Sequence, residues 1–408
     1  MSKKKILVIP MAAMAETAGP GGRCKILAEG FRQAGFDVRT CMAKDVNFIK
    51  LEDIPNYELT VPTPMGMPDF SAKYFFPLVQ KLGITAKKTV NSFDQVLMFT
   101  GNLDKRYLRK SVEDIRCAIR DFKPDVVYSE FNISAMIAAK LENKQLFGTV
   151  SYPTRKEYAC NPKLAKELNQ FLDEVGLTKV NSALDLFDWM DEMFCPSIPE
   201  LEPFQTKVTF LGSIRKNTQF VQQNDKDMEM AYKNDAYKDN PQKNKVLVYM
   251  GNGTVSASKM LREVTKAFRG SLYQVYIASA YLKECESGNI HVAPRWDFGK
   301  LWQEVVLFIN HGGQNSMVDG LIHGVPQIVI PGKVFERKYN ADALENVSAG
   351  RILSHDRFCA ENIKKLADEV ITSEKMKENA GLIGEKLLKA GGIQTIVNAI
   401  DQMEKENE

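Results

Sequence analysis

The segment VVLFINHGGQNSMVDGLIHGVPQIVIPGKVFERKYNADAL, residues 305–344, decides the fold of this protein. Residues 305–310 are almost entirely apolar, which predicts a buried strand. The loop HGGQ follows, and residues 315–323 predict a helix that ends at Gly324. A second apolar run at 327–330 predicts another buried strand. Strand, helix and strand in this order predict a parallel sheet covered by helices.

The loop between this strand and this helix is a predicted anion site. The first N–H groups of a helix have no partner within the helix, and the helix dipole favours negative charge there. Gly312 and Gly313 would let the backbone approach a phosphate closely, and His311 could donate a hydrogen bond from the loop. Asn315 and Ser316 could donate to the same oxygens. Alternatively, these two side chains could only cap the helix, and the glycines could only form the turn.

Similar alternation of strand-like and helix-like segments extends over most of the chain. A stretch rich in Asn, Gln, Asp and Lys interrupts it near the middle, which is typical of an exposed linker. We therefore predict an α/β protein with the following parts: a first domain over 1–216, a polar linker over 217–244, a second domain over 245–385, and a C-terminal helix and tail over 386–408.

The start of the chain, MSKKKILVIPMAAMA, fits two interpretations. Its basic head, short apolar run and Ala-x-Ala sequence are similar to a secretory signal peptide. However, Pro10 interrupts the apolar run, and residues 6–10 also predict a buried strand that is followed by a helix over 23–34 and a strand over 37–41. We favour the strand, which would open the first domain.

The composition excludes several classes of protein. Of 408 residues, 44% are hydrophobic and 26% are charged, as in globular domains, and no apolar run reaches the roughly 18–20 residues of a membrane span. The net charge of +3 is a weaker basic excess than nucleic-acid binders show. The seven cysteines have neither zinc-site nor disulfide spacing. We expect a cytoplasmic protein with small-molecule partners and no nucleic acid; the oligomeric state is left open.

The pattern over residues 295–353 resembles the donor-nucleotide signature of glycosyltransferase family 1, the UDP-glycosyltransferase and macrolide glycosyltransferase-like enzymes. The signature of that family is close to HxGxNSxxE…GVPxxxxP…(D/E)Q…NA, and this chain has HGGQNS, GVPQIVIP, ER and NA in the same order. The resemblance implies the GT-B fold, in which two Rossmann-like domains with mostly parallel sheets face each other across a cleft. It also implies a nucleotide-sugar on the second domain, an acceptor on the first, and no obligatory metal or other cofactor.

The resemblance also implies which residues contact the donor phosphates. His311, Asn315 and Ser316 match the motif residues that contact the diphosphate in the family. Gly253 and Thr254 lie in a second Gly-rich loop, after the apolar run KVLVYM, and the corresponding loop of the family touches the phosphates. A turn that merely needs its glycines is the alternative for this second loop.

Other donor contacts are implied with departures from the family pattern. Asp319 stands where the family usually has Glu on the ribose hydroxyls, and its shorter side chain predicts a looser contact. Glu336 and Arg337 occupy the places of the Asp/Glu and Gln that bind sugar hydroxyls, and Arg in place of Gln leaves the sugar open. Arg295 or its neighbour Trp296 would stack on the nucleobase, although Trp296 could instead be a core residue.

The catalytic position departs furthest from the family. Members usually carry a His in the loop after the first strand, assisted by a distant Asp, whereas Pro20 takes that place here and the chain has no His before His291. An inverting transfer needs a general base near the acceptor hydroxyl. Two carboxylates are candidates: Glu16 in the same loop, and Glu130 after the strand KPDVVYS. Alternatively, Glu16 is a solvated loop residue and Glu130 a charge that precedes a helix.

Residues 19–22, Gly-Pro-Gly-Gly, precede the helix predicted over 23–34. In that place they would leave helix N–H groups free for an anionic acceptor or a phosphate, and Arg23 would add positive charge. A flexible turn is the alternative.

These observations favour an inverting glycosyltransferase that moves a hexosyl group from a UDP- or dTDP-sugar to a hydroxyl of a small lipophilic acceptor. The aromatic-rich segment 57–99 predicts an apolar acceptor pocket, unless its rings only pack against the sheet. The alternative is a catalytically inactive nucleotide-sugar-binding relative that acts as a partner subunit. A nucleotide-sugar epimerase of the same fold is disfavoured by the order of the motifs. Asp225-Lys-Asp227 lies in the polar linker, and we assign no metal to it.

Overall fold

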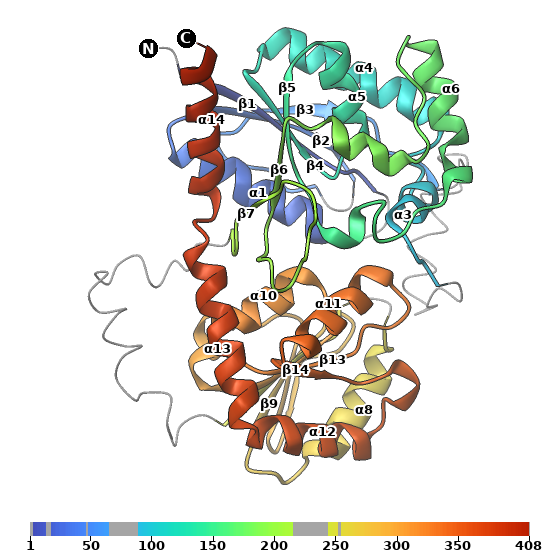
Figure 1. Ribbon diagram of the computed structural model, residues 1–408. Helices are drawn as coiled ribbons and strands as arrows, with labels where there is room; N and C mark the ends of the chain where they lie inside the picture. Colours follow the sequence, from blue (N-terminus) through green and yellow to red (C-terminus); the bar gives the residue numbers. More distant parts are fainter. Residues whose placement is uncertain are drawn as a thin grey trace. The chain divides into compact units, whose positions relative to one another are not determined.

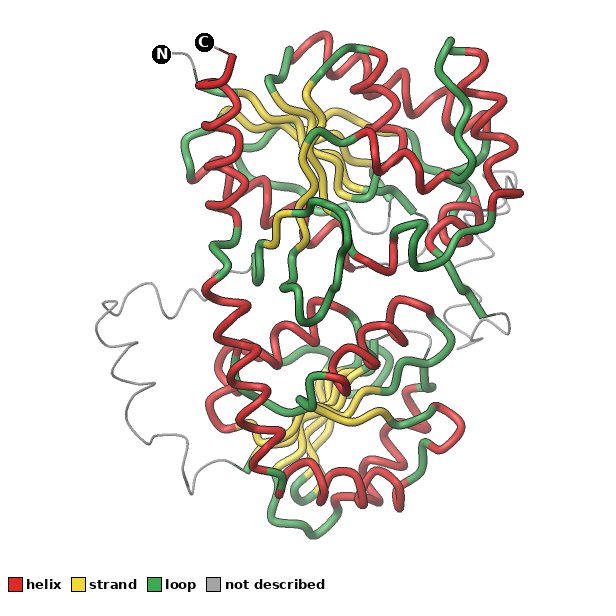
Figure 2. Tube along the Cα trace, viewed as in Figure 1, coloured by secondary structure: helices red, strands yellow, loops and turns green. Residues whose placement is uncertain are grey.

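The chain forms two compact units in its computed structural model. The structure describes residues 3–13, 18–45, 48–64, 89–214, 244–251 and 254–407. Unit 1 contains the described residues among 1–84, 90–214 and 390–408, and unit 2 those among 85–89 and 215–389. Figure 1 shows both units as strands flanked by helices, and Figure 2 marks the same elements by type. All but one residue of the predicted polar linker lies outside the described residues.

Unit 1 is built on a seven-stranded parallel sheet in the order β3-β2-β1-β4-β5-β6-β7. Its strands are β1 (Lys5–Pro10), β2 (Asp37–Ala43), β3 (Asn56–Leu59), β4 (Val126–Glu130), β5 (Gln145–Thr149), β6 (Glu192–Cys195) and β7 (Thr209–Phe210). The strand predicted over residues 6–10 is thus confirmed, and it lies near the centre of the sheet. Its apolar run is buried completely because helices cover both faces of a parallel sheet.

The helices of unit 1 include one that begins earlier than predicted. They are α1 (Ala18–Gln33), α3 (Phe93–Phe99), α4 (Lys105–Phe122), α5 (Ile133–Leu141), α6 (Lys166–Glu174) and α14 (Ile393–Asn407), with 3₁₀ turns η2 (Tyr152–Thr154), η3 (Pro162–Ala165) and η4 (Ala183–Trp189). The prediction that residues 19–22 precede a helix starting at Arg23 is wrong, because they belong to the start of α1. Pro20 is compatible with this place, since a first-turn residue has no N–H partner to lose.

Unit 2 is built on a second seven-stranded sheet, in the order β10-β11-β9-β8-β12-β13-β14. Its strands are β8 (Lys245–Tyr249), β9 (Gln274–Ala278), β10 (Cys285–Ser287), β11 (Ile290–Ala293), β12 (Val305–Asn310), β13 (Gln327–Val329) and β14 (Gly350–Ile352). The β10–β11 pair is antiparallel and the other pairs are parallel. The strand predicted over 305–310 is confirmed and pairs with both β8 and β13.

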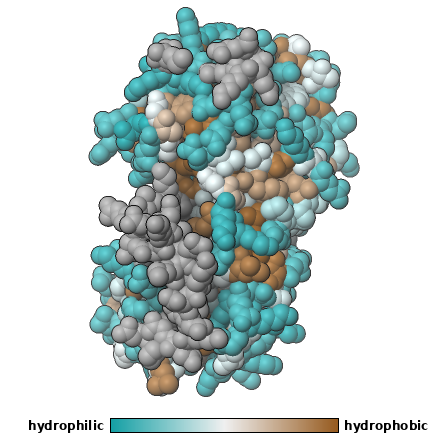
Figure 3. Space-filling view, turned by 60° about the vertical axis from the view of Figure 1, so that its left-hand side comes forward, coloured by the Kyte–Doolittle hydropathy of each residue, from teal (hydrophilic) through white to brown (hydrophobic). Residues whose placement is uncertain are grey.

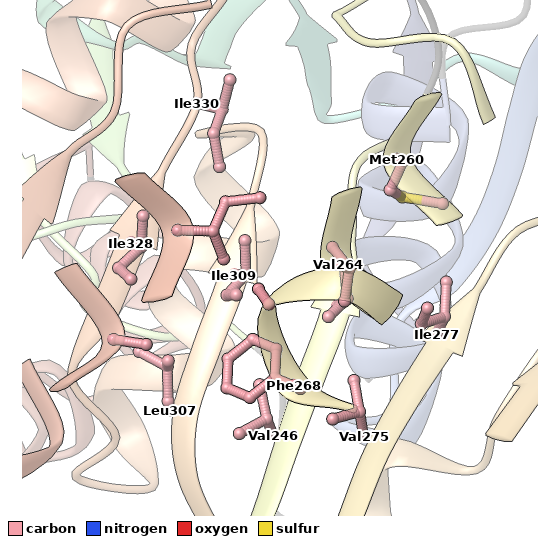
Figure 4. Close-up of a cluster of buried hydrophobic side chains, with 14 of the residues drawn as sticks. Val246, Met260, Val264, Phe268, Val275, Ile277, Leu307, Ile309, Ile328 and Ile330 are labelled. Carbon is pink, nitrogen blue, oxygen red and sulfur yellow. The ribbon is translucent and has the colours of Figure 1, made fainter. Parts of the chain in front are cut away.

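Helices cover this second sheet and complete its core. They are α8 (Ala257–Phe268), α9 (Phe298–Leu301), α10 (Gln314–Ile322), α11 (Phe335–Asn346), α12 (Ala360–Thr372) and α13 (Glu374–Lys389), with 3₁₀ turns η5 (Trp302–Glu304) and η6 (His355–Arg357). Figure 4 shows apolar side chains of β8, β9, β12 and β13 gathered around Met260, Val264 and Phe268 of α8. The helix predicted over 386–408 is two helices, because α13 ends at Lys389 and α14 begins at Ile393.

The surface is largely hydrophilic where Figure 3 shows described residues. Among the described residues, three large hydrophobic side chains are more than half exposed: Leu272, Tyr281 and Leu382. Within the same residues, no helix has both the length and the apolar character needed to cross a membrane.

Candidate functional site

The candidate site lies where three neighbouring parallel strands of unit 2 end. Tyr249 of β8, Asn310 of β12 and Val329 of β13 pair side by side in the sheet, so the loops that follow them leave from one edge. The chain order also reverses here, because β9 lies on one side of β8 and β12 on the other. The carboxyl edge of a parallel sheet at such a reversal is where open α/β sheets bind ligands.

Two asparagine side chains hydrogen-bond to the backbone of the loop after β12. The Asn310 side-chain oxygen accepts the N–H of Gly312 at 2.8 Å, and the Asn340 amide donates to the carbonyl of Gly312 at 2.8 Å. Gly312 has φ +82°, and a Cβ there would lie 2.8 Å from the carbonyl oxygen of Arg337. Glycine is therefore required at this point of the loop. Neither asparagine was singled out from the sequence, although Asn310 ends the apolar strand and Asn340 belongs to the NA pair.

Helix α10 begins directly at this loop without a side-chain cap. Its N-cap residue is Gly313, so Asn315 and Ser316 stand in the first turn and do not cap the helix. Both side chains are half-buried. The first intrahelical bond runs from the N–H of Met317 to the carbonyl of Gly313. The N–H groups of Asn315 and Ser316 precede this bond and can contact an anion at this end of the helix.

His311 directly follows β12 and contacts Tyr249 at the end of β8. Its Nδ1 is 3.4 Å from the carbonyl oxygen of Tyr249, and its ring meets the Tyr249 ring edge-on with centroids 5.5 Å apart. Burial, together with the positive charge of Arg337, lowers the pKa of His311 from 6.5 to about 3. The imidazole is therefore neutral near pH 7. Because a carbonyl only accepts, Nδ1 carries the proton in this contact, and donation from Nε2 to an anion needs a further proton or the other tautomer.

Glycines make room for the His311 ring on two sides. A Cβ on Gly313 would lie 2.8 Å from Nε2, and a Cβ on Gly251 would lie 3.0 Å from Cε1. Gly251 also has a positive φ of +54°. The histidine, the Gly-rich loop and the end of β8 therefore fit together as one packed arrangement.

Arg337 of α11 joins the same group of residues. Its Nη1 donates to the hydroxyl of Thr254 at 2.8 Å, and Thr254 is buried after β8. Burial lowers the pKa of Arg337 below its usual value, and the neighbouring Glu336 acts in the opposite direction. Glu336 is half-buried in the first turn of α11. Gly253, which the sequence places beside Thr254, lies outside the described residues.

Arg295 and Trp296 follow β11, further along the same sheet. The indole N–H of Trp296 donates to the carbonyl of Ile277 at 3.1 Å, and its ring meets Tyr276 edge-on with centroids 5.1 Å apart. Trp296 is half-buried and Arg295 is exposed, so neither is a residue of the hydrophobic core. The buried tryptophan of this region is Trp302.

Asp319 lies one turn into α10 and is half-buried. Its carbonyl oxygen is 2.7 Å from Nδ1 of His323, near the end of the helix. Within the part of the chain that the structure describes, no group of three or more His, Cys, Asp or Glu side chains could hold a metal ion.

Of the two candidate bases in unit 1, only one is described. Glu130 ends β4 beside the end of β1, is completely buried, and forms an ion pair with the Nε of Arg23 from α1. The Arg23 guanidinium also lies 5.2 Å from the centre of the Phe131 ring. Glu130 Oε2 has no hydrogen-bond partner among the residues that the structure describes. The pair was not predicted, because nothing in the spacing of two residues 107 positions apart indicates it. Glu16 lies outside the described residues.

A small hollow opens in unit 1 at the carboxyl ends of β1 and β2. Its lining is mostly apolar and consists of Pro10, Met11, Ala12, Gly21, Met42, Ala43, Asp45 and Phe48. Two described aromatics of the predicted acceptor segment have other contacts: Phe93 packs edge-on against Phe131 and Phe187, and Tyr57 accepts a hydrogen bond from Arg39. Four further aromatics of that segment lie outside the described residues: Phe70, Tyr74, Phe75 and Phe76.

Part of the chain is similar to known glycosyltransferase sequences. Residues 283–403 match the family model of the erythromycin biosynthesis protein CIII-like C-terminal domain. The uncharacterized UDP-glucosyltransferase YojK of Bacillus subtilis is 31% identical over 144 residues, which are 34% of this chain and 34% of that protein. The aligned part thus spans about a third of the length of that relative.

Solved structures match over nearly the whole chain. The calicheamicin glycosyltransferase CalG4 has a TM-score of 0.71 at 14% identity, covering 99% of this chain and 98% of that chain. The spinosyn rhamnosyltransferase SpnG, in a structure complexed with thymidine diphosphate, has a TM-score of 0.64 at 13% identity, covering 97% of this chain and 100% of that chain. These similarities, with the two mostly parallel sheets, confirm the predicted GT-B fold.

Proposed function

We propose that the chain, as a member of glycosyltransferase family 1, transfers a hexosyl group from a UDP- or dTDP-sugar to a hydroxyl of a small lipophilic acceptor, with inversion. One observation carries the proposal. The uncapped start of α10 meets His311, Thr254 and Arg337 at the carboxyl edge of a parallel sheet. Backbone N–H groups, a histidine and a guanidinium at one edge suit an anionic nucleotide.

The proposed diphosphate contacts centre on the loop after β12. The backbone N–H groups at Gly313 and in the first turn of α10 face the anion, and Asn315 and Ser316 add side-chain donors. His311 contacts a phosphate oxygen through Nε2, which requires the proton arrangement described above. Gly253 and Thr254 complete the phosphate side in this proposal.

The remaining donor contacts follow the family pattern. Asp319, on α10, binds the ribose hydroxyls, and Glu336, at the start of α11, binds a hydroxyl of the sugar. Trp296 or Arg295 stacks on the nucleobase. Because the indole N–H of Trp296 is already bonded to the sheet, its ring is held in one orientation, which favours Trp296 of the two.

The donor site is tested by binding and turnover on the full chain. Isothermal titration calorimetry with UDP and dTDP measures affinity, and nucleotide release from UDP- and dTDP-sugars with a panel of hydroxyl acceptors measures transfer. We expect His311→Ala to weaken nucleotide binding about tenfold or more through loss of a hydrogen bond to a charged group. His355→Ala, in a 3₁₀ turn, is the matched control and should leave affinity unchanged. Equal affinity for the wild type and His311→Ala would contradict the donor-site assignment.

For the general base, we propose Glu16, with Glu130 as the second candidate. Complete burial and the ion pair with Arg23 keep Glu130 from direct contact with an acceptor hydroxyl, which favours Glu16. We expect Glu16→Gln to lower kcat by roughly 10²-fold or more, the usual contribution of a general base. Glu130→Gln should keep most of the turnover of the correctly folded fraction.

Glu130→Gln leaves the buried Arg23 charge without its carboxylate, so its fold is checked by circular dichroism and its kcat is compared with that of Glu130→Asp, which keeps the charge. Loss of turnover in folded Glu130→Gln, together with full turnover in Glu16→Gln, would assign the base to Glu130. Unchanged turnover in both variants would contradict both assignments.

The second candidate function is a nucleotide-sugar-binding partner subunit without catalysis. Pro20 favours it, because Pro20 stands in the first turn of α1 where the family usually has a catalytic His. Tight UDP or dTDP binding with no turnover against any acceptor, and recovery of turnover in a complex with an active relative, would support this function.

We also propose a cytoplasmic location, which reduced cysteines suit; the seven cysteines form no disulfide in the structure.

A further inference from the structure

Arg337 occupies a sugar-binding place in the family pattern, but its contacts lie elsewhere. The residue expected there is a Gln that binds sugar hydroxyls. In this chain the Arg337 guanidinium donates to Thr254, whose hydroxyl belongs to the Gly-rich loop after β8. In the family, the loop that corresponds to this one touches the donor phosphates and not the sugar. The direction of the Arg337 side chain thus differs from the role that its place in the motif implies.

Two further observations tie Arg337 to the phosphate side of the site. Its positive charge is one of the causes that lower the pKa of His311, so the two groups are electrostatically coupled. Its backbone carbonyl oxygen lies close to Gly312, because a Cβ at Gly312 would be only 2.8 Å from this oxygen. Arg337 therefore belongs to the same arrangement as His311, Gly312 and Thr254 at the ends of β8 and β12.

The chemistry of a guanidinium suits phosphate better than sugar hydroxyls. Arginine carries five N–H donors in a planar fork that matches phosphate oxygens, and its charge assists each bond. A nucleotide diphosphate brings negative charge, whereas a sugar hydroxyl is neutral. The half-buried surroundings of Arg337 strengthen the attraction, because charges interact more strongly when water is partly excluded.

We propose that Arg337 binds the diphosphate of the donor, held in place by Thr254, and stabilises the charge that develops on the leaving nucleoside diphosphate. This inference rests on the proposed transferase function. In the transfer, the acceptor oxygen bonds to the anomeric carbon, and the bond from that carbon to the β-phosphate oxygen breaks. The electron pair of the broken bond stays on the phosphate oxygen, and the acceptor proton goes to the general base. Arg337 faces the negative charge that this leaves on the diphosphate.

The experiment separates a phosphate contact from a sugar contact. Calorimetry on the full chain measures the affinities for uridine, UDP and UDP-glucose, and the same series with thymidine nucleotides covers a dTDP-specific enzyme. The variants are Arg337→Gln, which places the family residue, Arg337→Lys, which keeps a charge, and Thr254→Val, which removes the holding hydroxyl. Lys338→Gln is the matched control, because it removes one exposed positive charge from the same helix.

We expect Arg337→Gln to weaken UDP binding about tenfold or more, as loss of a charged hydrogen bond does, while uridine binding stays unchanged. Arg337→Lys should recover part of the UDP affinity, Thr254→Val should weaken UDP binding less than Arg337→Gln, and Lys338→Gln should leave all affinities unchanged. With an active acceptor, kcat should fall in Arg337→Gln.

Two results would overturn the inference alone. Unchanged UDP affinity with weakened UDP-glucose affinity would make Arg337 a sugar ligand, and equal losses for uridine and UDP would indicate a structural role. A wild-type protein that binds neither UDP nor dTDP would instead overturn the proposed function, and this inference with it.

Discussion

Single residues shape the anion-binding edge of unit 2, and the most telling of them is His311. The residue is 9% exposed, and its ring is enclosed by Tyr249 and by the glycines of two loops. Such surroundings disfavour the charged imidazole. The free protein therefore presents a neutral histidine to an incoming anion, and the positive charge at this edge comes from Arg337 and the start of α10.

We expect His311 to stay neutral in the free protein from pH 8 down to pH 5. Burial and Arg337 lower its pKa from 6.5 to about 3, well below this range. Nuclear magnetic resonance of ¹³C-labelled imidazoles checks this, since the chain has only four histidines and His311→Asn identifies the resonance. A titration midpoint between pH 5.5 and 7 in the free protein would contradict the expectation.

The same residue affects stability, with a definite sign. The unfolded chain takes up a proton on His311 near pH 6.5, whereas the folded protein does so only near pH 3. The neutral ring thus contributes stability that is fully present above pH 6.5 and is lost as the pH falls from 6.5 towards 3. The slope is up to roughly 1.4 kcal/mol per pH unit.

At the scale of elements, helix α13 packs closely against α10 at a glycine. A Cβ on Gly384 would lie 2.0 Å from the carbonyl oxygen of Leu321 in α10, whereas Gly381, in the same helix, has nothing within 4 Å of a Cβ. The two glycines thus lie in the same helix but differ in the residues that surround them. Gly384 is required by the close approach of two helices, and Gly381 is not.

We expect Gly384→Ala to destabilise unit 2 by about 1–3 kcal/mol, because backbone atoms must move to admit the methyl group. Gly381→Ala is the matched control and should stabilise the protein by up to about 1 kcal/mol, since Ala is the better helix former. Denaturant unfolding followed by circular dichroism measures both variants. Destabilisation of similar size in both would mean that the close approach to Leu321 is not the cause.

At the scale of the whole molecule, the chain returns to its first unit at the end. After α13 of unit 2, Gly391 and Gly392 adopt positive φ, and α14 then joins unit 1. Its residues Ile396 and Ile400 are buried in the core that also contains β1 and α1. The segment 386–408, predicted as a C-terminal helix and tail, thus contributes to a core that begins almost 400 residues earlier in the sequence.

We expect Ile396→Ala to destabilise unit 1 by about 3 kcal/mol, through lost apolar contacts and the cavity left behind. Asn398→Ala, at an exposed place in the same helix, is the control and should change little. Hydrogen exchange followed by mass spectrometry locates the effect. Faster exchange is expected in β1 and α1 of unit 1, with unchanged exchange in β12 of unit 2. Equal acceleration in both units would contradict the assignment of α14 to unit 1.

Much of this protein follows from local sequence. The apolar run at 305–310, the glycines after it and Gly324 were enough to predict a strand, a tight loop and a helix stop, because burial and positive φ restrict the residues that fit. The motif pattern also predicted the family and the GT-B fold. The start of α1 was missed, because Gly and Pro in a first helical turn look the same in sequence as in a loop.

Contacts between residues that are distant in the sequence could be identified only in the folded structure. Arg23 pairs with Glu130, and Arg337 donates to Thr254, although the residues of each pair are 83 or more positions apart. Likewise, α14 joins unit 1 from the other end of the chain. No local periodicity carries such information, because a side chain finds a distant partner only after strands and helices have been placed. Side-chain partners across the sheet edges depend on tertiary packing, whereas the strands and turns themselves depend on neighbouring residues.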